Sequence, residues 1–205
     1  MQDFGEQRVT ADREYNKAIA PIIADLASNG FEVPSLDVLA KSKAYKEAVP
    51  ILVKWLPVVT DPRIKEAIVR TLSVPWAGPE AAKSLVIEFR NAPASTNTGL
   101  KWAIGNALEV VATEDIFEEL IELAQDKRHG KAREMVAMAI GKIKNPRSDD
   151  VLIGLLDDEE VAGHALIGLR KLNAKEALPF IRRFVNHPKT WIRQEAIKAI
   201  AKMEK

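Results

Sequence analysis

The 205-residue sequence predicts an all-α fold, a right-handed α-solenoid of about five helix pairs that follows an N-terminal helical cap. One helical pattern recurs along the chain, with apolar anchors at Ile64, Leu100, Ala132, Val161 and Ile192. These anchors are 36, 32, 29 and 31 residues apart, a period typical of stacked helical repeats. No segment shows sustained period-two alternation bounded by turn dipeptides, so the pattern predicts no sheet.

The composition limits the classes of function. Apolar residues make up 47% and charged residues 29% of the chain, as in ordinary globular proteins. Thirty basic residues nearly cancel 29 acidic ones, whereas a dedicated nucleic-acid binder usually has a clear basic excess. There is no cysteine, which excludes disulfides, thiolate nucleophiles and zinc–thiolate sites.

The N-terminal sequence and the apolar runs bear on location. The first eight residues are too charged for a secretory signal peptide. The longest apolar runs are far shorter than a bilayer-spanning helix needs. We therefore expect a cytoplasmic protein without a membrane association.

Residues 1–43 do not match the repeat and are expected to form the N-terminal cap. Apolar residues at steps of three and four predict a helix over Gly5–Ser28, bent at Pro21. Gly30 supplies a left-handed stop, and Ser35 opens a short second helix. Because the terminal unit of a solenoid must stop the stack, we expect its outer face to be polar.

Residues 44–205 are expected to form one continuous repeat array, with units at 44–74, 78–112, 113–144, 145–173 and 174–205. Each unit reads as two helices. In the first unit, Pro50 is expected to kink the leading helix. Asp61 followed by Pro62 marks the start of the next helix, because aspartate caps free amides and proline at the first position has none to lose.

The repeats share a local motif. A polar residue stands in the turn within four of the five repeats, at Asp61, Asp126, Asp157 and Asn186. An aliphatic residue and then a basic one follow on the next helix, and the basic positions are Lys65, Lys101, Arg133 and Arg193, here called the basic column. Repeat four departs from the motif at Ala162, and repeat two has no clear turn acid.

With this motif, residues 44–205 resemble HEAT-like repeats, especially the short bacterial kind related to phycobilin-lyase HEAT-like domains. The resemblance implies an α-solenoid that acts as a binding scaffold. Within such an array, a turn aspartate and a basic side chain of the next helix can form a ladder between neighbouring repeats. The members of the expected ladder are Asp61, Lys65, Lys101, Asp126, Arg133, Asp157 and Arg193. The alternative is a basic stripe for phosphates or acidic peptides, against which the interspersed glutamates Glu66, Glu134 and Glu195 argue.

The second helix of each pair is expected to line the concave face, where ligands of such solenoids dock. Trp102, Asn106 and Glu109 share one face of their helix, away from the face of Leu108. A tryptophan beside polar groups on a concave face is typical of an interaction hot spot, although it can also pack against the neighbouring repeat. The candidate partner-binding residues on this face are Trp102, Asn106, Glu109, Glu134, Met138, His164, Ile167, Gln194 and Lys198.

No catalytic or metal-binding pattern is found. The three histidines lie in different repeats without metal-ligand spacing. The acidic run at 157–160 is interpreted as a helix start, where carboxylates cap amides. The glycines at 105, 141 and 168 are interpreted as points of close helix approach. Leu108, Ile140, Leu169 and Ile200 are expected to form core. We therefore expect no metal, no cofactor and no enzymatic activity.

Three functions remain open at this point. The leading hypothesis is a non-enzymatic scaffold that docks a protein or peptide on the concave face. The alternative is a nucleic-acid-binding HEAT-like protein related to alkylpurine DNA glycosylases, because Trp102, Trp191 and Arg193 resemble the composition of their groove. The third, suggested by family likeness alone, is a lyase or maturation factor for a tetrapyrrole protein, for which the sequence supplies no chemistry.

Overall fold

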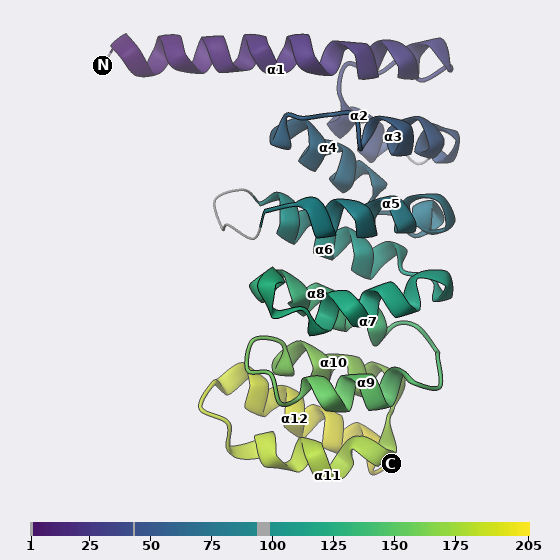
Figure 1. Cartoon of the computed structure of the whole chain (residues 1–205), viewed down its shortest axis with the longest axis vertical. Coiled ribbons are helices and arrows are strands. Elements are labelled where there is room, and N and C mark those ends of the chain that lie inside the picture. The colour runs from purple at the N-terminus through teal and green to yellow at the C-terminus, as the bar shows by residue number, and fades with distance from the viewer. Residues whose placement is uncertain (1, 43, 94–98) are drawn as a thin grey trace.

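The computed structural model describes the backbone of residues 2–42, 44–93 and 99–205, and the side chains of these residues from Val9 onward. Within these ranges the chain forms helices and no strand. The helices lie in successive layers along one axis, from the N-terminus to the C-terminus (Figure 1). This arrangement confirms the predicted all-α solenoid.

The N-terminal helix α1 spans Gln2–Ser28 and continues through Pro21. Its C-terminal half buries Ile19, Ile22 and Leu26 against the array. It lies across one end of the stack, and its N-terminal part projects beyond the helices below it (Figure 1). The chain then turns at Gly30, whose φ of 89° is left-handed as expected.

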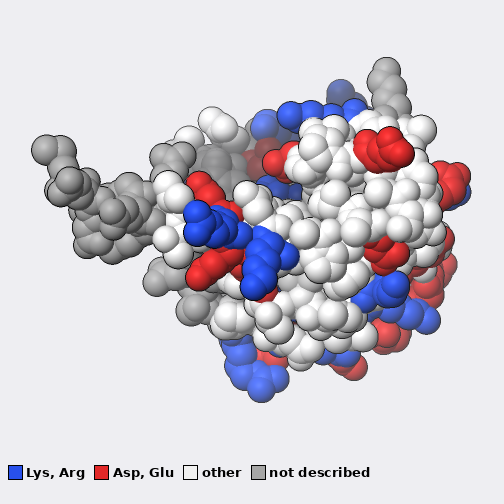
Figure 2. Space-filling view, turned by 90° about the horizontal axis from the view of Figure 1, so that it is seen from above, with Lys and Arg blue, Asp and Glu red and all other residues white. Residues whose placement is uncertain are grey.

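The short helix α2 (Leu36–Lys41) begins as expected after Ser35, whose side chain accepts a hydrogen bond from the Val38 amide. The exposed side of α1 carries Arg13 and Lys17 together with small uncharged residues such as Ala20, Ala24 and Ala27. Much of this end of the molecule carries no charge (Figure 2).

The remaining helices form pairs. The first helices of the pairs are α3 (Val49–Trp55), α5 (Gly78–Asn91), α7 (Phe117–Gln125), α9 (Ser148–Leu155) and α11 (Leu178–Ile181). The second helices are α4 (Pro62–Leu72), α6 (Leu100–Val111), α8 (Arg133–Ile140), α10 (Ala162–Leu172) and α12 (Thr190–Met203). One-turn 3₁₀ segments lead into α3, α5, α7 and α11, and longer ones precede α8 and follow α11.

Proline and aspartate set the start of the first pair. Pro50 was expected to kink a longer helix, and this prediction is wrong. It lies in the first turn of α3, after a 3₁₀ turn, where its missing amide costs no helical hydrogen bond. Asp61 caps α4 as expected, because its side chain accepts a hydrogen bond from the Arg63 amide at 2.8 Å.

The second helices contact one another in sequence, from α4 through α6, α8 and α10 to α12. Leu108, Ile140 and Leu169 are fully buried between the layers, whereas Ile200 in the last helix is half-buried. Gly141 and Gly168 allow the close approach predicted for them, since a Cβ on Gly141 would lie 2.3 Å from the Gly168 Cα. In the ranges that the structure describes, no helix combines the length and apolar character needed to cross a bilayer.

Candidate functional site

One row of side chains along the second helices remains accessible to solvent. We call it the second-helix face and define it by the nine partner-binding residues predicted above together with Arg70. Trp102, Gln194 and Lys198 are exposed, and Asn106, Glu109, Glu134, Met138, His164 and Ile167 are half-buried. Every predicted residue is thus at least partly accessible. The structure divides the row into two clusters around tryptophans and one ion pair.

The first cluster surrounds Trp102. Its indole is 52% exposed and borders a cavity of about 320 Å³ that is also lined by Arg70, Ser73, Ala103 and Asn106. Asn106 donates a hydrogen bond to the Trp102 carbonyl at 3.0 Å, which fixes its amide beside the indole. The cavity therefore combines an aromatic surface with a guanidinium, a hydroxyl and an amide.

Ser73 was not among the predicted residues. It follows α4 and comes from the neighbouring repeat, so only the stacking of α4 on α6 brings it to Trp102. In the preceding repeat, Arg70 occupies the position equivalent to Asn106. The alignment of the repeats therefore already indicated that Arg70 belongs to this face. Its guanidinium pairs with Glu66 at 2.6 Å on the same helix.

Glu109 does not belong to the Trp102 cluster. Its carboxylate pairs with Lys171 at 3.0 Å, and Lys142 donates to its backbone carbonyl at 3.1 Å. Both lysines come from later repeats, so these contacts tie the end of α6 to the layers below it. Glu109 therefore has a structural role in cross-linking three layers of the array.

The second cluster is formed by Trp191, His164 and Glu134. The ring centroids of Trp191 and His164 are 5.5 Å apart, and the His164 Nε2 lies 3.9 Å from the Glu134 carboxylate. Burial lowers the pKa of His164, and the charge of Glu134 opposes this shift. A cavity of about 290 Å³ lies beside Trp191, with Glu134, Gly163 and Lys189 among its walls.

Trp191 is 43% exposed and was not one of the predicted partner-binding residues. It stands one position before the aligned anchor Ile192, so the repeat register alone does not place it on this face. The glycine at position 163 in the preceding repeat was a signal in the sequence, because its missing side chain leaves the space that the Trp191 indole fills.

The basic column is largely withdrawn from solvent. Arg133 is fully buried, and it binds Asp158 and Glu160 at 2.7 Å each and the Ala124 carbonyl at 3.0 Å. Lys65 pairs with Glu88 at 2.6 Å. Charged groups in such positions must be paired or hydrogen-bonded, because desolvation of a lone charge is costly.

The other two members of the column bind backbone carbonyls. Lys101, which is only 6% exposed, donates to Ala92 at 2.6 Å. Arg193 donates to the carbonyls of His187 and Pro188 at 2.7 and 2.9 Å. In these repeats, as with Arg133 and Ala124, the basic side chain reaches back to the turn within its own repeat.

The predicted pairing of turn aspartates with the basic column is wrong in detail. Asp61 pairs with Arg63 and Asp126 with Arg128, at 2.7 and 2.6 Å, because an arginine two residues further on reaches its own turn. Asp157 pairs with Arg183 at 2.5 Å. Asp126 retains an electrostatic influence on Lys101 without a direct bond.

The acidic run 157–160 caps an amide as expected, because the Asp158 carboxylate accepts a hydrogen bond from the Glu160 amide at 3.1 Å, shortly before helix α10 begins at Ala162. Asp158 and Glu160 also reach the guanidinium of Arg133 in the preceding repeat. Asp158 and Glu160 thus form the ion pairs between neighbouring repeats that were predicted for the turn aspartates. The described part of the chain holds no group of three or more histidine, aspartate or glutamate side chains that could bind a metal ion.

The paired, stacked helices and the row of accessible side chains on the second helices define a helical-repeat protein. A sequence profile of HEAT repeats matches residues 90–162 and 156–205, which together make up more than half of the chain. The chain belongs to the HEAT repeat family. No curated protein and no solved structure matches it.

Proposed function

We propose that this HEAT-repeat protein is a non-enzymatic binding module that docks a protein or peptide on the second-helix face. The observation that carries the proposal is the indole of Trp102, 52% exposed beside a cavity lined by Arg70, Ser73 and Asn106. Tryptophan and arginine are enriched among the residues that dominate protein interfaces. Tryptophan side chains are on average largely buried in folded proteins.

The rest of the face suits a polypeptide partner. Met138 and Ile167 lie half-buried in the middle of the row and offer apolar contact, to which the flexible methionine can adapt. Trp191 provides a second accessible indole at the α10–α12 end. Apolar anchors separated along a row of helices fit an extended or helical segment, whose side chains enter successive sites.

Burial of the basic column supports this proposal over nucleic-acid binding. Arg133 is inaccessible, Arg193 directs its guanidinium to carbonyls of its own turn, and Lys65 is neutralised by Glu88. Most nucleic-acid affinity comes from cations that can reach phosphates. The nearly equal numbers of acidic and basic residues point the same way.

The test is affinity capture from a lysate of the source organism, in which the wild type is compared with a Trp102→Ala/Asn106→Asp variant by mass spectrometry. We expect one polypeptide that the wild type enriches and the variant loses. With the purified partner, Trp102→Ala alone is expected to weaken binding at least about tenfold, as for an interface hot spot.

The matched control is Ile87→Ala, which removes a side chain that is 53% exposed on the first helix of the same pair. This variant is expected to retain capture. Circular dichroism should show that all variants are folded. If a folded Trp102 variant captures the partner as well as the wild type does, the second-helix face is not the docking surface.

A further inference from the structure

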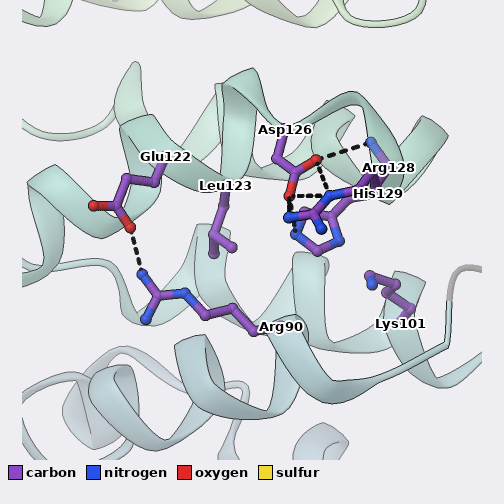
Figure 3. Close-up of a pocket in the computed structure, with 7 residues that line it drawn as sticks. All are labelled: Arg90, Lys101, Glu122, Leu123, Asp126, Arg128 and His129. Atoms are coloured by element: carbon purple, nitrogen blue, oxygen red, sulfur yellow. Dashed lines mark hydrogen bonds and ion pairs between the residues drawn. The ribbon is translucent and has the colours of Figure 1, made fainter.

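A third cavity lies apart from the second-helix face, between the end of α5, the start of α6 and the turn that follows α7. Its volume is about 520 Å³. Arg90 enters it from the end of α5 and Lys101 from the start of α6, while Asp126 and the following turn form the opposite wall (Figure 3). We call it the Lys101 cavity.

Both carboxylates of the cavity wall are already neutralised. Glu122 pairs with Arg90 at 2.6 Å, and Asp126 pairs with Arg128 at 2.6 Å. The hydrogen bonds from Arg128 hold the pKa of Asp126 far below its usual range, so this carboxylate is charged at any physiological pH. Among the residues that the structure describes, these two ion pairs use both carboxylates of the wall and leave its third cation without a carboxylate partner.

That third cation is Lys101. Its side chain is almost fully withdrawn from solvent, and its ammonium donates to the Ala92 carbonyl and lies 5.2 Å from the Phe89 ring centroid. An ammonium has three donors, and a carbonyl and an aromatic ring supply no full negative charge. Burial lowers the pKa of Lys101, and the charge of Asp126 opposes this shift.

The other cations of the wall keep donors to spare. A guanidinium has five N–H groups, and in the described residues Arg90 uses one of its nitrogens, for Glu122. His129 packs its ring edge-on against Phe89, at 5.1 Å between centroids. Burial is the main cause that lowers the pKa of His129, and the Nε2 atom of this residue lies 3.5 Å from the Asp126 carboxylate.

We propose that the Lys101 cavity binds a small organic oxyanion, a metabolite that carries a phosphate or carboxylate group. The oxyanion accepts hydrogen bonds from the Lys101 ammonium and neutralises it, and the unused donors of Arg90 and Arg128 enclose the group from the sides. Leu123 lies in the wall between these arginines and provides apolar contact for the organic part. A volume of this size fits a small metabolite better than a bare ion.

The proposal is independent of the docking function. It is tested by isothermal titration of the full chain with inorganic phosphate, glycerol phosphate and succinate at constant ionic strength. Chloride, at equal concentration, is the comparison for non-specific screening. We expect saturable binding of at least one oxyanion. The tighter of glycerol phosphate and succinate identifies the group as phosphate or carboxylate.

The decisive variant is Lys101→Met, which keeps the apolar stem and removes the charge. It is expected to weaken oxyanion binding at least about tenfold and to reduce the rise in melting temperature that the oxyanion gives the wild type. The matched control is Lys83→Gln, an exposed lysine on α5 outside the cavity, which should bind as the wild type does.

If Lys101→Met does not fold, Arg90→Gln decides the question, because this arginine is 43% exposed and its loss leaves the buried lysine in place. It too is expected to weaken binding relative to Lys83→Gln. Absence of saturable binding to all three oxyanions overturns the proposal. It is equally overturned by a folded Lys101→Met variant with wild-type affinity.

Discussion

The indole of Trp191 occupies the space that a side chain on Gly163 would need. A Cβ on Gly163 would lie 2.1 Å from the Cη2 atom of Trp191. The two residues belong to neighbouring second helices, Gly163 to α10 and Trp191 to α12. The missing side chain in one repeat therefore makes room for an aromatic residue of the next repeat, beside His164 of the second-helix face.

Gly163→Ala is expected to move the Trp191 indole further into solvent. The clash falls on the outer edge of a partly exposed ring, which can rotate away, and alanine gains about 1 kcal/mol of helix propensity. The free energy of unfolding should therefore change by less than about 1–3 kcal/mol, the usual cost of overpacking in a core. The measurable result is a red shift of tryptophan fluorescence.

Two comparisons isolate this effect. The shift should vanish when Gly163→Ala is made in a Trp191→Phe background. Gly154→Ala in α9, where an added Cβ meets nothing within 4 Å, should leave the spectrum unchanged. An unshifted spectrum for Gly163→Ala would contradict the role of Gly163 in placing the indole.

Gly141→Ala is expected to be more damaging, because the added Cβ meets backbone. The Gly168 Cα would be 2.3 Å away, and relieving that contact requires two stacked helices to separate. We expect a loss of at least about 1–3 kcal/mol in the free energy of unfolding, measured by urea denaturation. A Gly141→Ala protein as stable as Gly154→Ala would show that the layers are not packed at this point.

Ile140→Ala is expected to lower the free energy of unfolding by about 2–5 kcal/mol, because it opens a cavity between fully buried layers. Ile200→Ala in the last repeat should cost less, since that side chain is half-buried and has no following repeat to cover it. Urea denaturation of the two variants side by side measures the difference. Equal losses would be inconsistent with the observed difference in burial.

We expect the Arg133–Asp158 ion pair to make the stability of the protein depend on pH in the acidic range. The hydrogen bond from Arg133 lowers the pKa of Asp158, so the folded state binds the proton of this carboxyl group less tightly than the unfolded chain does. The resulting stability is fully present above the unfolded pKa of about 4 and is lost as the pH falls through the lower folded value. Thermal melts from neutral pH to about pH 2 should show this loss.

The Asp158→Asn variant isolates the contribution of this ion pair to the pH dependence of stability. It should be less stable than the wild type at neutral pH and should lose less stability on acidification. Asp157→Asn is the neighbouring control, because Asp157 is 75% exposed and pairs with Arg183 at the surface, where ion pairs contribute little. Parallel stability–pH curves for the wild type and Asp158→Asn would contradict the assignment.

The sequence alone was sufficient for the solenoid, for the end of the first helix at Ser28 and for the helix starts after Ser35 and at Pro62. Apolar residues at helical steps, the repeat period, the Asp61 cap and the Gly30 stop act through neighbours in the chain, and such local signals can be read directly. The burial of Ile140 and the close approach of Gly141 followed from the same periodicity. Pro50 was misread, because a proline that begins a helix and one that kinks it look alike without the preceding 3₁₀ turn.

Only the tertiary structure decided which charges and which side chains meet. Asp61 and Asp126 pair with arginines of their own turns, and Asp157 pairs with Arg183 of the next repeat. Arg133 binds Asp158 and Glu160 instead, because pairing depends on the offset between stacked layers and on the reach of each side chain. The same offset brought Ser73 to Trp102 and Trp191 to Gly163, and it enclosed Lys101 in its cavity. The repeat spacing in the sequence determines that the layers stack. The offset between neighbouring layers depends on how their side chains pack.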